Sequence, residues 1–225
     1  MTGAPLHALC STLFEGVRDL VSPPFCVACG AFLPRREHLC LRCRRGIIPP
    51  ATCTVEVARG QSMKVYALSD YDGVIRDLVL SKNYRSPIGS RQLGELLAAS
   101  ACCPWNEFDC VVPIPLHWTR YAWRGFNQAT VMARAIRAVH RISIIYPAVR
   151  SARTMQQTRL AYGDRQRNVR DIFVLRRGGA DLLRGKRVLL LDDVMTTGAT
   201  LRALARTLTA AEPAAIAAIV AARVL

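Results

Sequence analysis

The stretch RVLLLDDVMTTGATL, residues 187–201, decides the fold and directs the search for function. Its apolar run is typical of a buried β-strand, and Asp192 and Asp193 lie where that strand would end. A turn into a helical pattern follows, formed by Thr196, Thr197, Gly198, Ala199 and Thr200. Backbone N–H groups at a helix start attract anions, glycine allows close approach and threonine hydroxyls donate hydrogen bonds. An anion pocket beside two carboxylates suits a sugar phosphate, whose hydroxyls or bound Mg²⁺ would face the carboxylates. An ordinary threonine-capped helix needs only one such hydroxyl.

Strand-like and helical patterns alternate through most of the chain. The strand-like segments are 64–72, 109–116, a short one around 144–149, 171–175, 187–194 and 214–222, and the helical segments are 73–84, 89–100, 127–139 and 201–211. This order predicts an α/β fold with a mostly parallel sheet flanked by helices, in which ligands bind at the carboxyl ends of the strands. We place this domain at residues 51–225, with a connecting or hood part at 51–105 and the core at 106–225.

Residues 1–50 are predicted to form a separate small module. Leu6 to Leu20 have the spacing of an amphipathic helix, and two CxxC pairs follow, Cys26 with Cys29 and Cys40 with Cys43, ten residues apart. Four thiolates suit a tetrahedral structural zinc, whereas a disulfide within CxxC is strained. His38 lies between the pairs, but using it as a ligand would leave half of one CxxC pair without a metal. We expect a four-cysteine zinc site that supplies much of the module's folding energy.

The charge of the chain points to an anionic partner. The formal net charge is +15, carried almost entirely by arginine. Such a balance favours nucleic acid or phosphorylated metabolites, although an arginine-rich genome or solubility would also produce it. On the zinc module, Arg35, Arg36, Arg42, Arg44 and Arg45 either contact phosphates or are simply solvated. No apolar run is long enough to span a bilayer and the first residues do not resemble a signal peptide, so we expect a cytoplasmic protein.

Several motifs together resemble a known family. They are the four cysteines, YDGVIRDLVLSKNYR, VVPIPLHWTRYAWRGFNQA, RTMQQTRLAYGDRQRNVRDIF and LLLDDVMTTGATL. The last resembles the phosphoribosyl pyrophosphate (PRPP) loop of type I phosphoribosyltransferases, which have a Rossmann-like fold. Within them the chain is similar to the ComF family of competence and DNA-uptake proteins, which carry an N-terminal four-cysteine zinc module.

The resemblance implies a role for each segment. Asp192 and Asp193 would hold the ribose hydroxyls of PRPP and its Mg²⁺, and residues 196–200 would cradle the 5′-phosphate. The turn near Leu116 and His117 would be the pyrophosphate loop. The segment 153–168 would be a mobile loop, with Arg153, Gln157, Arg165, Arg167 and Asn168 as candidate ligands.

Other readings remain open for the basic residues. His117, Arg120 and Arg124 follow a strand end and could neutralise pyrophosphate, but Arg124 and Asn127 also fit the start of a helix. The segment 150–170 contains six arginines and could be a closing lid, a DNA contact strip or a solvated loop. Lys82 and Arg85 could bind phosphate or only complement a helix dipole.

Two functional hypotheses follow. In the first, the chain is an enzyme that uses PRPP; several purine-salvage relatives have an acidic residue at the position of Thr196, so nucleobase salvage is disfavoured here, and Asp164 or Asp193 would have to act as base. In the second, it is a factor for incoming single-stranded DNA, with a helicase or recombination protein as partner, acting in natural transformation. Aromatics among Arg120 and Arg124, namely Trp118, Tyr121, Trp123 and Phe126, could stack bases, but their helical spacing favours a place in the core.

Overall fold

The computed structural model describes residues 23–34, 37–80, 86–151 and 172–224. Several predictions lie outside the described residues: the N-terminal helix, Arg35, Arg36, Lys82, Arg85, Asp164 and all five mobile-loop candidates, Arg153, Gln157, Arg165, Arg167 and Asn168. The chain divides into two compact units, residues 1–47 and 48–225. We describe each unit by itself.

The first unit is organised by tight turns around its cysteines. The Cys26 N–H donates to the Ala31 carbonyl at 2.8 Å, and Gly30 closes this turn with a φ of +72°. The short helix α2 (Leu41–Arg45) begins at Cys40, whose sulfur accepts a hydrogen bond from the Cys43 N–H. The buried apolar residues described in this unit besides cysteine are Leu33 and Leu39. So small a core depends on a further source of stability.

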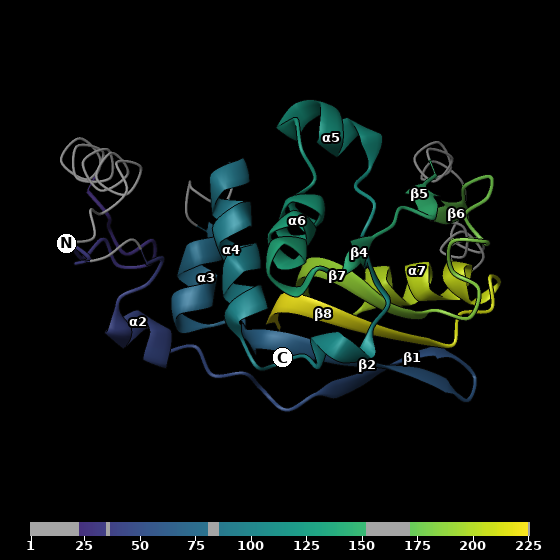
Figure 1. Ribbon diagram of the computed structural model, residues 1–225, viewed down its shortest axis with the longest axis horizontal. Coiled ribbons are helices and arrows are strands. Elements are labelled where there is room, and N and C mark those ends of the chain that lie inside the picture. The colour runs from purple at the N-terminus through teal and green to yellow at the C-terminus, as the bar shows by residue number, and fades with distance from the viewer. Residues whose placement is uncertain (1–22, 35–36, 81–85, 152–171, 225) are drawn as a thin grey trace, which may run out of the picture. The chain divides into compact units, whose positions relative to one another are not determined.

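The second unit is built on a six-stranded sheet in the order β1-β2-β8-β7-β3-β4 (Figure 1). The strands are β1 (Cys53–Ala58), β2 (Gln61–Asp70), β3 (Cys110–Pro113), β4 (Ser143–Ile144), β7 (Arg187–Met195) and β8 (Ala215–Arg223). Only β1 pairs antiparallel in this sheet, as the first arm of a hairpin with β2. The predicted mostly parallel sheet is therefore confirmed.

Three local features were not predicted. The hairpin arm β1 was missed, and its turn uses Gly60 at a φ of +76°. The single strand expected around 144–149 is two strands, β4 and β5 (Ala148–Arg150), and β5 pairs instead with β6 (Phe173–Leu175) in a second, two-stranded sheet. Pro147 lies between the two strands and has no N–H to continue a ladder. The loop expected after β3 contains the helix α5 (Trp118–Arg124).

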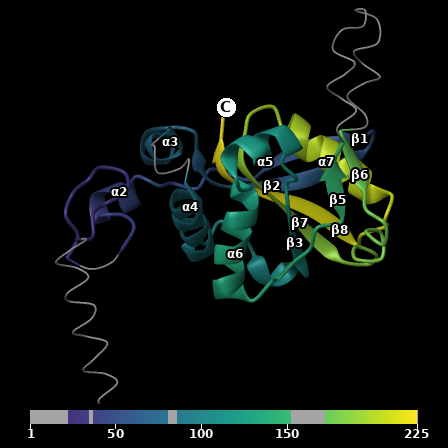
Figure 2. The same ribbon diagram turned by 90° about the horizontal axis from the view of Figure 1, so that it is seen from above.

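Helices cover the sheet on both faces. They are α3 (Gly73–Leu80), α4 (Pro87–Ala99), α6 (Gln128–His140) and α7 (Ala199–Thr209), besides a short 3₁₀ turn, η2 (Trp105–Glu107). Figure 2 shows α4 and α6 side by side and apart from α7. Their contact is close, since a Cβ added at Gly94 would lie 2.7 Å from the Met132 Cα.

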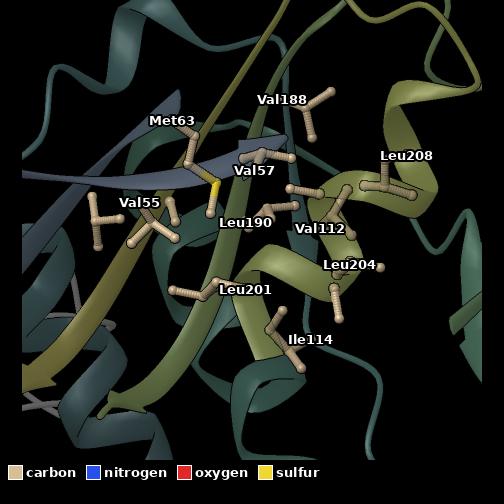
Figure 3. Close-up of a cluster of buried hydrophobic side chains, with 14 of the residues drawn as sticks. Val55, Val57, Met63, Val112, Ile114, Val188, Leu190, Leu201, Leu204 and Leu208 are labelled. Carbon is tan, nitrogen blue, oxygen red and sulfur yellow. The ribbon is translucent and has the colours of Figure 1, made fainter. Parts of the chain in front are cut away.

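Alternation along the strands divides the core into two layers. Val188 and Leu190 of β7 join α7 in one buried cluster, where Leu201, Leu204 and Leu208 point toward the strands (Figure 3). Leu189 and Leu191 are equally buried and, because neighbouring strand residues face opposite ways, lie on the other side. The central strand is thus covered on both faces, which explains its continuous apolar run.

The parallel register brings the ends of several strands to one edge. Pro113, the last residue of β3, pairs with Leu191, and the Ile114 N–H donates to the Leu191 carbonyl at 2.9 Å. The segment that follows β3 therefore leaves the sheet beside Asp192. Asp70 at the end of β2 forms a 2.9 Å ion pair with Arg223 at the end of β8 on the same edge. Within the described ranges no helix is long and apolar enough to cross a membrane.

Candidate functional site

Two adjacent carboxylates lie near the carboxyl end of β7. Asp192 and Asp193 are both partly buried. An oxygen of Asp192 accepts a hydrogen bond from the Asp193 N–H at 3.0 Å, and an oxygen of Asp193 accepts one from the Val194 N–H at 2.7 Å. Burial, together with the charge of Asp193, raises the pKa of Asp192 well above its usual range. A cationic ligand at this position would relieve that cost by favouring the charged form of both groups.

The phosphate-loop candidates form the turn between β7 and α7. Gly198 is the N-cap residue of α7, with a φ of +69°, and it has no side chain that could cap the helix. The hydroxyl of Thr197 accepts a long hydrogen bond of 3.4 Å from the Ala199 N–H, and Thr196 and Thr197 are exposed. Because the first N–H groups of a helix have no partners within the helix, this turn presents donors to an anion. A Cβ at Gly198 would approach Val55 to 3.1 Å, so the turn also needs glycine for space.

His117 follows β3 and is buried. Its Nδ1 accepts a hydrogen bond from the Thr119 N–H at 3.3 Å and lies 2.7 Å from the Thr119 hydroxyl. Since Nδ1 is the acceptor, the neutral ring carries its proton on Nε2. Among the described residues, Nε2 has no hydrogen-bond partner. Within the described part of the chain this buried donor therefore has no protein acceptor. The partly buried Leu116 precedes it in the sequence.

Arg124 and Asn127 lie where α6 begins. The Asn127 side chain accepts from the Ala129 N–H at 3.0 Å and donates to the Ile114 carbonyl at 2.9 Å, and Arg124 donates to the Gln128 side chain. Asn127 thus caps α6 and ties its start to the end of β3. This arrangement matches the helix-start alternative that the sequence left open for these two residues.

Arg150, the first residue of the polar segment 150–170, is a further candidate that was not among the predicted site residues. It ends β5, and its guanidinium lies 5.8 Å from the centre of the Phe173 ring. Burial, followed by the positive charge of Arg120, lowers the pKa of Arg150, while Asp192 opposes that shift. The two arginines and the carboxylate therefore interact electrostatically. An arginine at the end of an apolar strand, directly before a polar segment, was the available signal.

The first unit brings the four predicted cysteines together. The sulfur atoms of Cys26, Cys29, Cys40 and Cys43 all lie within 4.8 Å of one another, and those of Cys29 and Cys40 are 3.8 Å apart. In a tetrahedral site with Zn–S bonds of about 2.3 Å, sulfur atoms are separated by about 3.8 Å. His38 is not a member of the cluster. The four-cysteine cluster expected from the sequence is confirmed, and its ligand set and spacing fit zinc.

Hydrogen bonds within the cluster already favour thiolates at two positions. Burial alone would raise the pKa of Cys26, but the N–H groups of Cys40, Cys29 and Ala28 outweigh it and lower that pKa to about 6. The Cys43 N–H likewise lowers the pKa of Cys40. Burial and the neighbouring thiols raise the pKa of Cys43 to about 12. The four sulfurs therefore hold protons unequally, and a bound cation would displace those protons.

Comparison with known proteins adds a family to this geometry. Residues 122–224 match the family described as phosphoribosyl transferase domain. This part of the chain is similar to phosphoribosyl transferase domains. The match includes β7, the turn 196–200, α7 and β8, and so contains the carboxylate pair and the open helix start. With the mostly parallel sheet, it establishes the type I phosphoribosyltransferase fold class that we expected.

The domain also has homologues among curated proteins. DNA utilization protein YhgH of Salmonella typhimurium is 29% identical over 210 residues, which are 89% of this chain and 83% of that protein. Competence protein F of Haemophilus influenzae is 31% identical over 101 residues, 44% of each chain. Among solved structures, glutamine PRPP amidotransferase from B. subtilis, complexed with ADP and GMP, is similar at 18% identity and a TM-score of 0.43, over 60% of this chain and 26% of that one.

One prediction about the segment after β3 is wrong. The aromatics of α5 do not lie in the core, because Trp118, Tyr121 and Trp123 are 62%, 53% and 77% exposed. The helix has no buried residue. Helical spacing of aromatics indicates a core face only when an element packs over that helix. Trp105, by contrast, is buried and stacks on the ring of His140 with centroids 4.7 Å apart.

Proposed function

We propose that the phosphoribosyl transferase domain binds PRPP together with Mg²⁺. The observation that carries the proposal is the carboxylate pair and the open start of α7 at the end of one strand, β7. A phosphate bound at the start of α7 would bring the ribose of the same ligand toward the two carboxylates, because only a short turn separates β7 from α7.

Each side chain then has a defined task. Asp192 and Asp193 hold the ribose hydroxyls and supply oxygen ligands for Mg²⁺, which neutralises pyrophosphate when bound. The N–H groups and hydroxyls of residues 196–200 bind the 5′-phosphate. His117 directs its Nε2 donor and Arg120 and Arg150 their charges toward the pyrophosphate. Arg124 and Asn127 position the start of α6 and the end of β3.

We further propose that the protein binds single-stranded DNA and acts in DNA uptake during natural transformation. The support is threefold: a net charge of +15, a cysteine cluster that fits structural zinc, and homologues named for competence and DNA utilization. Positive charge alone provides sequence-independent affinity for the phosphate backbone. A helicase or recombination protein remains a proposed partner.

The alternative is a phosphoribosyltransferase of nucleotide metabolism without a DNA role, which the complete phosphate turn favours. Pyrophosphate release from Mg²⁺–PRPP, with and without a short single-stranded oligonucleotide, separates the two functions. Release that depends on the oligonucleotide supports transfer in a DNA context, and binding of both ligands without release supports a DNA-handling factor. Release with nucleotide precursors as acceptors, and no binding of DNA, would overturn the DNA role. Failure to bind PRPP would overturn the assignment of the site.

A further inference from the structure

The seven residues of α5 place aromatic and cationic side chains on one continuous surface. Successive residues of an α-helix are rotated by about 100°. Going around α5, the side chains therefore follow the order Trp123, Arg120, Arg124, Tyr121, Trp118. The remaining arc holds only Thr119 and Ala122. The two arginines are thus flanked by aromatic rings on both sides.

This surface is exposed to an unusual degree for its composition. Three large aromatic side chains, each more than half exposed, belong to a helix with no buried residue. Contiguous exposed apolar patches on proteins commonly mark interaction sites. Figure 1 shows α5 lying beyond the start of α6 and away from the sheet.

The α5 surface is joined to the proposed PRPP site. His117 is the residue at which α5 begins, and its imidazole lies 5.9 Å from the centre of the Trp118 ring. Arg120 interacts with Arg150, which in turn interacts with Asp192. A ligand that lies along α5 would therefore contact Trp118 beside His117, a residue of the proposed site.

The composition of the sequence around α5 favours one class of ligand. Residues 110–163 contain eight arginines and neither aspartate nor glutamate. A protein partner would ordinarily meet both signs of charge. A helix that lies on a membrane separates its cationic and apolar residues onto opposite faces, whereas in α5 the arginines lie between the rings. Single-stranded nucleic acid offers phosphates for the arginines and unpaired bases for the rings, each stacked base contributing about 1–3 kcal/mol.

We propose that α5 is a base-stacking surface for single-stranded nucleic acid, with Trp118, Tyr121 and Trp123 as stacking residues and Arg120 as the phosphate contact nearest the PRPP site. This inference rests on the proposed DNA binding and gives it a location.

The test compares a thymidine oligonucleotide with an abasic oligonucleotide of the same length, by fluorescence anisotropy with the full, zinc-loaded chain. The abasic strand keeps the phosphates and lacks the bases. We expect Trp118→Leu/Trp123→Leu to weaken binding of the thymidine strand at least about tenfold, as loss of two stacked bases implies, and to leave abasic binding unchanged. Trp118→Phe/Trp123→Phe should restore most of the difference, because phenylalanine keeps an aromatic face.

Charge variants provide the matched control. Arg120→Ala should weaken binding of both strands, as loss of a phosphate contact does. Arg137→Ala removes the same charge from the exposed last turn of α6 and should have a smaller effect. All variant positions are exposed, so circular dichroism should show an unchanged fold.

The outcomes separate the inference from the proposed function. If the wild-type chain binds both strands equally, or the leucine variant binds thymidine as tightly as the wild type, the stacking surface is overturned while DNA binding stands. If no variant or wild-type chain binds either strand, the DNA role fails as well. Concentration-dependent dimerisation that only the leucine variant loses, with DNA binding intact, would assign α5 to a second copy of the chain instead.

Discussion

Asp192 and Asp193 put two carboxylates side by side where a buried strand ends. Burial and mutual repulsion raise the pKa of Asp192, so its charged form is disfavoured in the folded protein. A group whose pKa is higher in the folded than in the unfolded state contributes stability at low pH and loses it as pH rises through the folded pKa. The carboxylate pair is therefore a feature that costs stability at neutral pH, which is typical of a binding site.

Replacing one carboxylate should stabilise the protein and weaken its binding of Mg²⁺–PRPP. Asp192→Asn keeps an oxygen that can accept from the Asp193 N–H and removes the buried charge. We expect a gain on the order of 1 kcal/mol at pH 8, seen as a rise in Tm of about 2–4 °C, and a smaller gain at pH 4. Thermal melts at both pH values measure it. A gain in stability that is equal at the two pH values, or larger at pH 4, would contradict the buried charge of Asp192 as its cause.

Gly198 provides a second test at single-residue scale. Gly198→Ala forces a side chain into a left-handed conformation and toward Val55, at a cost of about 1–2 kcal/mol, and should also displace the N–H groups that bind phosphate. Gly185→Ala is the matched control, because Gly185 has a φ of +68° with open space around it. Both variants should lose stability in urea unfolding, but only Gly198→Ala should lose PRPP affinity, by about tenfold or more. If Gly198→Ala and Gly185→Ala bind PRPP with equal affinity, the turn is not part of the binding site.

At the scale of elements, the start of α6 links the pyrophosphate-loop candidates to the sheet. Asn127→Ala removes both the helix cap and the hydrogen bond to Ile114, whereas Asn127→Asp keeps the cap and replaces the donor with an oxygen that faces the Ile114 carbonyl. We expect a loss of about 1 kcal/mol of stability for alanine and a smaller loss for aspartate. Both should raise the Kd for Mg²⁺–PRPP several-fold, measured by calorimetry. An aspartate variant that binds PRPP as well as the wild type would show that the tether does not position the loop.

The elements also show what sequence could and could not predict. The string from Arg187 to Leu201 was informative because a strand, a turn and a helix start are all local, and their residues are neighbours in the chain. The pairing of β5 with β6 joins segments on either side of a long polar stretch. The position of Arg150 depends on this long-range pairing and could not be predicted from local sequence. The exposure of α5 was mispredicted because spacing reports periodicity and not what packs over a helix.

At the scale of the whole molecule, the chain joins a cysteine-organised unit to a phosphoribosyl transferase domain. The first unit has little apolar core, so zinc should supply its folding energy. Cys29→Ser should lower the zinc content from about one ion per chain and expose the remaining thiols to a thiol reagent. Cys102→Ser, which lies outside the cluster, should retain the ion. Mg²⁺–PRPP affinity should stay within about twofold in both variants, because the proposed site lies entirely in the second unit. A large loss for Cys29→Ser alone would show that the two units share the site.

The most direct measurement of the central proposal is calorimetric titration of PRPP into the zinc-loaded chain, with and without Mg²⁺, for the wild type and for Asp192→Asn/Asp193→Asn. We predict saturable one-site binding that requires Mg²⁺. In the double variant, which should melt no lower than the wild type, the affinity should fall at least about a hundredfold, some 2.7 kcal/mol. Binding of equal strength in the two proteins, or binding indifferent to Mg²⁺, would contradict the assignment of the carboxylate pair.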